Sequence, residues 1–254
     1  FRDSKAYMQA TSNVIDQEKM AVILQQVVGN QYGDRYYPSM SGVARSLNYY
    51  PIGDEKAEEG TVNLALGLGK YIVDGGMTLR FSPAHPSKVL QTSELDIALK
   101  ETQTRFYALD LKNAGDNFSI DDGFNLLKLH VKEAEKDGSL RYIASTYDPY
   151  DQVIRDGLYP GGRKVITFAN ILQHDVFRIL RWVLRYGQQE MRRPVEIEFA
   201  VTLNHDRDKT GTFYLLQVRP IVDSKDMLDE DLTTIPDEDV LLRSNNSLGH
   251  GIMN

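Results

Sequence analysis

The sequence predicts an α+β protein in which a largely antiparallel sheet is flanked by helices. Three observations predict this fold class: short runs rich in β-branched or alternating residues, two segments with helical periodicity, and two alternating runs within 195–220 that are joined by a polar connection. The last pattern is typical of an antiparallel hairpin. A chain of 254 residues is long enough for one large domain or two small ones.

The composition is that of a globular protein with an acidic balance. Hydrophobic residues make up 41% of the chain and charged residues 26%, and the formal net charge is −7. Such a charge gives no general attraction for a phosphate backbone, so we expect no nucleic-acid partner. No apolar stretch approaches the ~18 residues of a membrane span, so we expect no membrane partner either.

The chain contains no cysteine, which excludes disulfides, thiolate metal sites and cysteine nucleophiles. This composition fits a cytoplasmic protein. The first residues also lack the basic and then apolar profile of a secretion signal. Because the chain begins with Phe1 rather than Met, we expect it to be part of a longer polypeptide.

Four strands are expected in the first half of the chain, and glycines mark where two of them end. We expect a largely buried strand within 18–29, a second within 41–47, a third that starts at Thr61 and ends at Gly67 and Gly69, and a fourth over 106–111. A short helix should follow the third strand. The polar stretch 87–104 is interpreted as a loop or an insertion.

The second half is expected to begin with a helix over 119–138, capped by Ser119 and ended by Gly138. Its apolar face would consist of Ile120, Phe124, Leu127, Val131 and Ala134. A strand over 140–147, a polar turn region over 148–163 and a strand over 165–169 should follow. In a second helix, over 170–186, one stripe contains Leu172, Val176, Leu180 and Val183, with Trp182 beside it.

After Pro220 the sequence becomes acidic and then rich in Gly, Ser and Asn. Such a composition is typical of a linker. We therefore expect one domain over 1–225, followed by a linker over 226–254.

The hairpin over 195–220 contains the polar residues with the clearest chemistry. If its connection is symmetric, Glu198 faces Gln217, Glu196 faces Arg219 and Ala200 faces Leu215. Alternation then places Ile197, Phe199, Val201, Leu216 and Val218 on one face, and Glu196, Glu198, Gln217 and Arg219 on the other. Two carboxylates, an amide and a guanidinium would converge on that second face.

This group of side chains suits a polyphosphate that is bound with a metal ion. Mg²⁺ prefers oxygen ligands, which the Glu198 carboxylate and the Gln217 amide can supply, while phosphates and water complete the shell. The planar guanidinium of Arg219 suits phosphate oxygens during transfer. The alternative is that the Glu–Arg pair is an ordinary solvated surface pair, and the pattern alone does not decide between them.

The segments MAVILQQVVG, SGVARS, GLGKYIVDGG, EIEFA and YLLQVRP occur in this order between Met20 and Pro220. Together they resemble the nucleotide-binding domain of the phosphoenolpyruvate synthase and pyruvate phosphate dikinase family, and the resemblance implies a partial, ATP-grasp-like lobe. Residues 81–170 match none of the family's motifs.

The resemblance also implies the site. Leu24, Gln25, Gln26, Val27 and Val28 occupy the adenine-binding strand and hinge of the V-Q-x-M-V type, with Val27 in place of Met. By the same resemblance, Glu198 and Gln217 are metal and phosphate residues, and Arg219 is the phosphate-binding, catalytic arginine. Glu196 stands in place of the usual Asp.

The chain departs from the family pattern at several points. Lys70 follows Gly69 where the family commonly reads GLGE, and SGVARSLN places Arg45 and Asn48 where an aromatic residue and an acid are usual. Upstream of the matched segments there is no V-R-S-S segment, and downstream there is no Gly-Gly-x-x-Ser-His block. His250 resembles the histidine of that block only weakly, and we interpret it as a linker residue.

Two interpretations of Gly67 and Gly69 stay open: they permit a tight strand-to-helix turn, or they let the backbone approach phosphates. The GLGK segment matches neither a dinucleotide-binding fingerprint nor a P-loop.

The resemblance implies an ATP-dependent, Mg²⁺-dependent enzyme. Phosphoryl groups would pass from ATP to a histidine on a separate mobile domain and then to pyruvate, and these downstream domains of the same polypeptide would be its partners. The 254 residues alone should show no turnover and at best weak nucleotide binding. Two alternatives are a related dikinase with a glucan or small-alcohol acceptor, and a catalytically silent nucleotide-sensing module.

Overall fold

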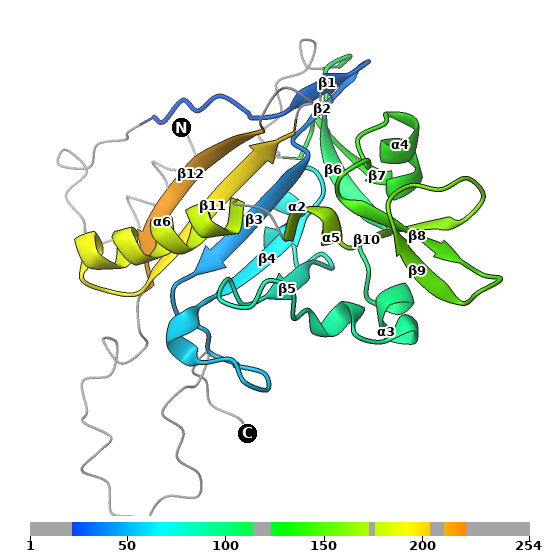
Figure 1. The fold of residues 1–254 in the computed structure, drawn as a ribbon. Helices are drawn as coiled ribbons and strands as arrows, with labels where there is room; N and C mark the ends of the chain where they lie inside the picture. The colour runs from blue at the N-terminus through cyan, green and yellow to red at the C-terminus, as the bar shows by residue number, and fades with distance from the viewer. Residues whose placement is uncertain (1–21, 114–122, 173–175, 204–210, 222–254) are drawn as a thin grey trace, which may run out of the picture.

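The computed structural model describes residues 22–113, 123–172, 176–203 and 211–221 as three antiparallel sheets with short helices (Figure 1). The strands are β1 (Asn30–Tyr32), β2 (Arg35–Tyr37), β3 (Met40–Arg45), β4 (Thr61–Ala65), β5 (Leu79–Phe81), β6 (Arg105–Asp110), β7 (Leu126–His130), β8 (Ala144–Asp148), β9 (Val153–Asp156), β10 (Arg163–Ile166), β11 (Val195–Thr202) and β12 (Thr212–Pro220). The helices are η2 (Ala57–Glu59), α2 (Lys70–Val73), η3 (Leu90–Thr92), α3 (Leu95–Lys100), α4 (Val131–Lys136), α5 (Ala169–Leu172) and α6 (Val176–Met191).

The largest sheet has the strand order β12-β11-β3-β4-β5, and every neighbouring pair in it is antiparallel. The other two sheets have the orders β1-β2-β6-β7 and β10-β8-β9. This arrangement confirms the predicted α+β class with a largely antiparallel sheet. Of the described helices, none is both long and apolar enough to cross a membrane.

Helix α6 covers one face of the five-stranded sheet (Figure 1). Its Gly187 lies against Val195 and Val218, and a Cβ built on that glycine would be 3.3 Å from a Val195 methyl. Alternation along β11 therefore places Ile197 on this covered face, where it is fully buried in the core. Gly42 lies opposite Phe199, and its missing side chain makes room for the aromatic ring.

Several predicted elements are confirmed with shifted ends. Segments 41–47 and 106–111 form β3 and β6, the third predicted strand is β4, and α2 follows it as expected. Segments 140–147 and 165–169 contribute to β8 and β10. The second predicted helix corresponds to α5 and α6, with 173–175 outside the described residues.

The predicted strand within 18–29 is wrong for its described part. Residues 22–29 are in no strand, and the side chains of Val22, Ile23 and Leu24 are exposed. The apolar run indicated burial, but strand formation also needs a partner, and no described strand pairs with it. Residues 18–21 lie outside the described part of the chain.

The predicted helix over 119–138 is wrong over 123–130 and confirmed only over 131–136. Residues Leu126–His130 form β7, which pairs with β6, and only Val131–Lys136 are helical. The ring nitrogen of His130, rather than Ser119, caps the helix by accepting a hydrogen bond from the Lys132 backbone N–H. Gly138 has φ +73°, which fits the predicted end. Residues 119–122, with Ser119 and Ile120, lie outside the described residues.

Two polar stretches contain regular structure that their composition did not indicate. The predicted turn region 148–163 includes β9, which pairs with β8. The stretch 87–104 includes η3 and α3. β9 is held by its pairing with β8, and η3 contacts β5, so the polarity of these segments did not indicate their tertiary contacts.

Candidate functional site

The hairpin of β11 and β12 has the predicted register in the half that contains the polar residues. Glu198 lies opposite Gln217, and Glu196 lies opposite Arg219. The register shifts between Glu198 and Phe199, so Ala200 lies opposite Tyr214 and the predicted pairing with Leu215 is wrong. The physical reason is a β-bulge that places one additional residue in β12.

Glu196 forms ion pairs with an arginine on each neighbouring strand. Its Oε2 is 2.6 Å from Nε of Arg45 on β3, and its Oε1 is 2.8 Å from Nε of Arg219 on β12. Nη2 of Arg219 donates to the same Oε1. We call Arg45, Glu196 and Arg219 the arginine–glutamate triad. The register places Arg45 directly opposite Glu196, so three adjacent strands form it.

Burial distinguishes the triad from an ordinary surface pair. The Glu196 residue is 5% exposed, whereas the arginine side chains are 39% and 57% exposed. Burial alone would raise the pKa of Glu196, but hydrogen bonds from Arg45 and Arg219 outweigh it and hold the pKa below its usual value. The hydrogen bonds to Glu196 also raise the pKa of Arg219. The solvated-pair interpretation therefore does not hold.

Glu198 and Gln217 lie on the same face as the triad, one alternation step along the strands. Glu198 is half-buried, Gln217 is exposed, and the negative charge of Glu198 acts on Arg219. Among the described residues, no side chain forms an ion pair with Glu198. The predicted convergence of Glu198, Gln217 and Arg219 on one side of the hairpin thus agrees with the register.

The glycine-rich turn between β4 and α2 also reaches this face. The Ser41 hydroxyl, on the same side of β3 as Arg45, donates a hydrogen bond of 2.7 Å to the Gly67 carbonyl, and Gly69 packs near Ser41. Gly67 has φ +84°, and a Cβ there would lie 2.6 Å from the Tyr107 carbonyl oxygen. These contacts show that the tight turn itself requires a glycine at position 67. A phosphate-binding role for the turn stays a prediction.

Gln25 in the predicted adenine segment lies beside β12, the edge strand of the largest sheet. Figure 1 shows this segment leading into β1. The side-chain amide of Gln25 donates a hydrogen bond of 3.2 Å to the Leu216 carbonyl, next to Gln217. The Val27 carbonyl accepts a hydrogen bond from the Tyr36 hydroxyl, and Val28 is half-buried. The structure thus brings Gln25 close to the hairpin.

A family model described as "Pyruvate phosphate dikinase, AMP/ATP-binding domain" matches residues 1–239. The chain belongs to this family. Among curated proteins, none matches it. Membership in the pyruvate phosphate dikinase AMP/ATP-binding family supports a nucleotide-binding function and the general class of kinase-like phosphotransferases.

Within this family fold, Glu198 and Gln217 offer two oxygen ligands at one register position. Among the described residues there is no group of three or more acidic or histidine side chains that could enclose a metal ion. Mg²⁺ commonly uses one or two protein carboxylates and takes its other ligands from substrate phosphates and water. The residues present therefore fit a magnesium ion that is shared with a bound nucleotide.

The departures from the family's usual motifs have local structural partners. Lys70 forms an ion pair with Asp74 across one helical turn. Asn48 is buried, accepts a hydrogen bond from Arg80 and donates one to Glu55, so it supports the loop after β3. The motif comparison gives Arg45 no role, although the alternation of SGVARS places it on the same side as Ser41.

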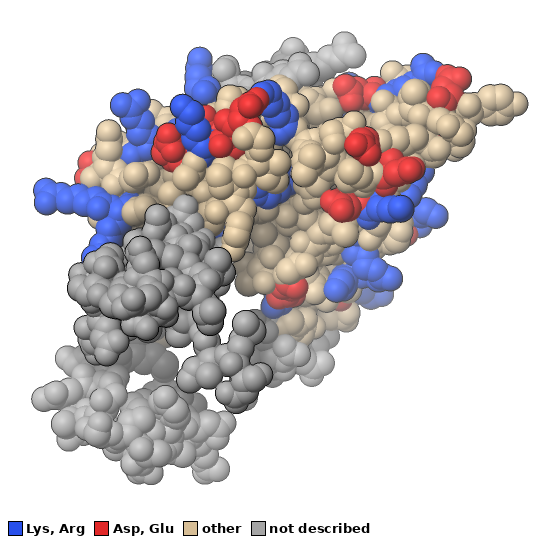
Figure 2. All heavy atoms as spheres, turned by 90° about the horizontal axis from the view of Figure 1, so that it is seen from below, with Lys and Arg blue, Asp and Glu red and all other residues tan. Residues whose placement is uncertain are grey.

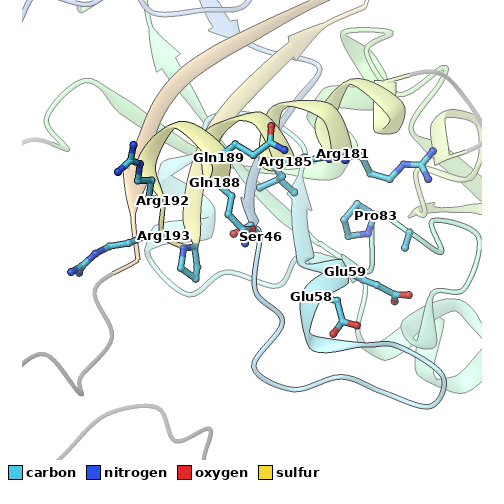
Figure 3. A pocket seen from close by; sticks show the side chains of 13 residues that line it. Ser46, Glu58, Glu59, Pro83, Arg181, Arg185, Gln188, Gln189, Arg192 and Arg193 are labelled. Atoms are coloured by element: carbon cyan, nitrogen blue, oxygen red, sulfur yellow. The ribbon is translucent and has the colours of Figure 1, made fainter.

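A cavity of about 640 Å³ lies elsewhere, between α6 and η2 (Figure 3). Its lining includes Arg181 and Arg185 on α6 and Glu58 and Glu59 on η2, but none of the predicted site residues. In the view from below, basic and acidic side chains are interspersed (Figure 2). His250 lies outside the described residues.

Proposed function

We propose that this domain binds Mg-ATP on the sheet face that carries Glu198, Gln217 and Arg219. In this proposal it belongs to a phosphoenolpyruvate synthase-like enzyme that transfers phosphoryl from ATP to a histidine on a separate mobile domain and then to pyruvate. One observation carries the proposal: Glu198 lies opposite Gln217, beside an Arg219 that is already held by a buried carboxylate. Family membership supports the nucleotide.

Each residue has a separate task in this proposal. Glu198 and Gln217 would hold the magnesium ion, which when bound neutralises phosphate charge. Arg219 would donate its remaining N–H groups to phosphate oxygens as charge moves during transfer. Because Glu196 already orients the guanidinium, little side-chain freedom is lost when the phosphate binds. Gln25, Val27 and Val28 would contact the adenine along the edge of β12.

The location and the final acceptor are also part of the proposal. The chain has no cysteine, which fits a reducing compartment, and we propose the cytoplasm. A glucan or small alcohol could replace pyruvate without any change at the nucleotide site, so the acceptor must be tested in the intact polypeptide. A silent nucleotide-sensing module would bind ATP but would transfer no phosphoryl group.

Titration of the 254-residue chain with ATP, followed by the NMR signals of the ligand, tests the nucleotide site at the weak affinity expected. We expect Mg²⁺ to strengthen ATP binding and Glu198→Gln to reduce this Mg²⁺-dependent gain about 10-fold, since the variant removes the charged ligand. Glu58→Gln is the matched control, because Glu58 is exposed and lines the cavity beside α6. Equal losses in both variants would contradict the proposed site.

A further inference from the structure

Arg45 has more hydrogen-bonding capacity than its ion pair uses. Its Nε donates to Oε2 of Glu196, and no described residue accepts a hydrogen bond from its two terminal amino groups. A guanidinium carries five N–H donors in one plane, so four of them are available for another acceptor. The side chain is 39% exposed, which leaves these donors accessible.

Arg219 is held in the same manner from the other side. Its Nε and Nη2 donate to Oε1 of Glu196, whereas Arg45 donates to Oε2. The two guanidinium groups therefore flank one carboxylate. Since a single arginine would neutralise Glu196, the second one gives the triad a net positive charge, beside the negative charge of Glu198 on the same face.

Two of the residues that differ from the usual family motifs contact each other here. Arg45 replaces an aromatic residue and Glu196 replaces an aspartate, and their side chains form the 2.6 Å ion pair. The longer glutamate places one oxygen toward each neighbouring strand. A purely structural ion pair would need only one of the two arginines.

We propose that Arg45 is a second phosphate-binding residue, which together with Arg219 binds oxygens of a polyphosphate chain, and that Glu196 positions both guanidinium groups. This inference rests on the proposed function for the identity of the ligand as a nucleoside triphosphate. The chemistry itself requires only a multiply charged phosphate chain. Guanidinium groups bind such oxygens through paired, charge-assisted hydrogen bonds.

The test compares ATP, AMP and inorganic tripolyphosphate as ligands of the 254-residue chain at one fixed salt concentration. In Arg45→Met we expect affinity for ATP and for tripolyphosphate to fall about 10-fold, because one charge-assisted contact is lost. Affinity for AMP should change less than about twofold, since its single phosphate binds nearest the adenine. Circular dichroism checks the fold of the variant. If Arg45→Met does not fold, Arg45→Gln is measured by the same criteria.

Arg185→Met is the matched control, because Arg185 lies in the cavity beside α6 (Figure 3). An unchanged preference for ATP over AMP in the Arg45 variant would overturn the inference and leave the proposed function intact. Tripolyphosphate binding that depends on Arg45, without any ATP binding, would support the inference and contradict the proposed function. An equal loss in Arg185→Met, or a wild-type chain that binds none of the three ligands, would overturn both.

Discussion

The two faces of the five-stranded sheet are built from alternate residues of the same strands but have different roles. On the face covered by α6, Val195, Ile197 and Phe199 are buried in the core. On the other face, Glu196 is equally inaccessible, yet its neighbours are two charged arginines. Burial in this sheet therefore supports apolar packing on one face and fixes the orientation of charged groups on the other.

Substitutions on the polar face should change the rate of phosphoryl transfer more than substitutions on the covered face. Under the proposed function, Arg219→Ala in the intact polypeptide should lower ATP-dependent histidine phosphorylation by roughly 10²–10⁴-fold, because a charge-stabilising donor is lost. Quench-flow measurement with radiolabelled ATP would give the rate. Arg185→Ala, on the covered side, should stay within about twofold. A decrease below about threefold in Arg219→Ala would contradict its assigned role.

The apolar face should respond in stability rather than in chemistry. Ile197→Ala should lower the free energy of unfolding by about 2–5 kcal/mol, because it leaves a cavity in a fully buried position. Leu215→Ala is the control, since Leu215 on β12 is 48% exposed. Urea unfolding followed by fluorescence would measure both variants. Similar losses in the two would show that the covered face is not packed as described.

The contribution of Glu196 to the free energy of unfolding should depend on pH. Because the pKa of Glu196 is lowered in the folded state, its contribution to stability is present above the unfolded value near 4.5 and is lost as the pH falls through the folded value. At pH 7, Glu196→Gln should cost about 1–3 kcal/mol, less than a fully buried pair because both arginines are partly exposed.

Urea unfolding at pH 7 and pH 3 would test this prediction. The stability difference between the wild type and Glu196→Gln should shrink at pH 3, because below about 4.5 the carboxyl group of the unfolded chain takes up a proton that the folded state binds less readily. Glu58→Gln should show little difference at either pH, since Glu58 is exposed. A difference that persists unchanged at pH 3 would mean that packing of the side chain, rather than its charge, is responsible.

The sequence was most informative where alternation and motif agreed. Strict alternation around Glu196 and Glu198 predicted which side chains share a face, and the register confirms that Glu196 faces Arg219 and Glu198 faces Gln217. It failed over 119–138, because Leu127 and Val131 fit helical spacing while the neighbouring β6 offered an edge for pairing. Helical periodicity within one segment does not show whether that segment pairs with another strand.

The contact between Arg45 and Glu196 lay beyond prediction for a similar reason. The two residues are far apart in the sequence, and they meet because β3 and β11 are neighbours in the sheet. The extra residue in β12 was equally hidden, since alternation gives faces but not the length of the connection. Long-range strand order therefore determined the part of the site that the sequence did not predict.

The bulge after Glu198 divides the pairing of β11 with β12 into two registers, whereas the pairing of β11 with β3 is continuous across it. The half with Glu198 and Gln217 extends to the open end of the hairpin. There the Ile221 backbone N–H donates a hydrogen bond of 2.7 Å to the Pro194 carbonyl. The opposite half pairs Phe199 with Leu215 and Thr202 with Thr212. Because the register changes between these two halves, we expect a change in the length of the connection to alter the pairing of Phe199–Thr202 more than that of Glu196 and Glu198.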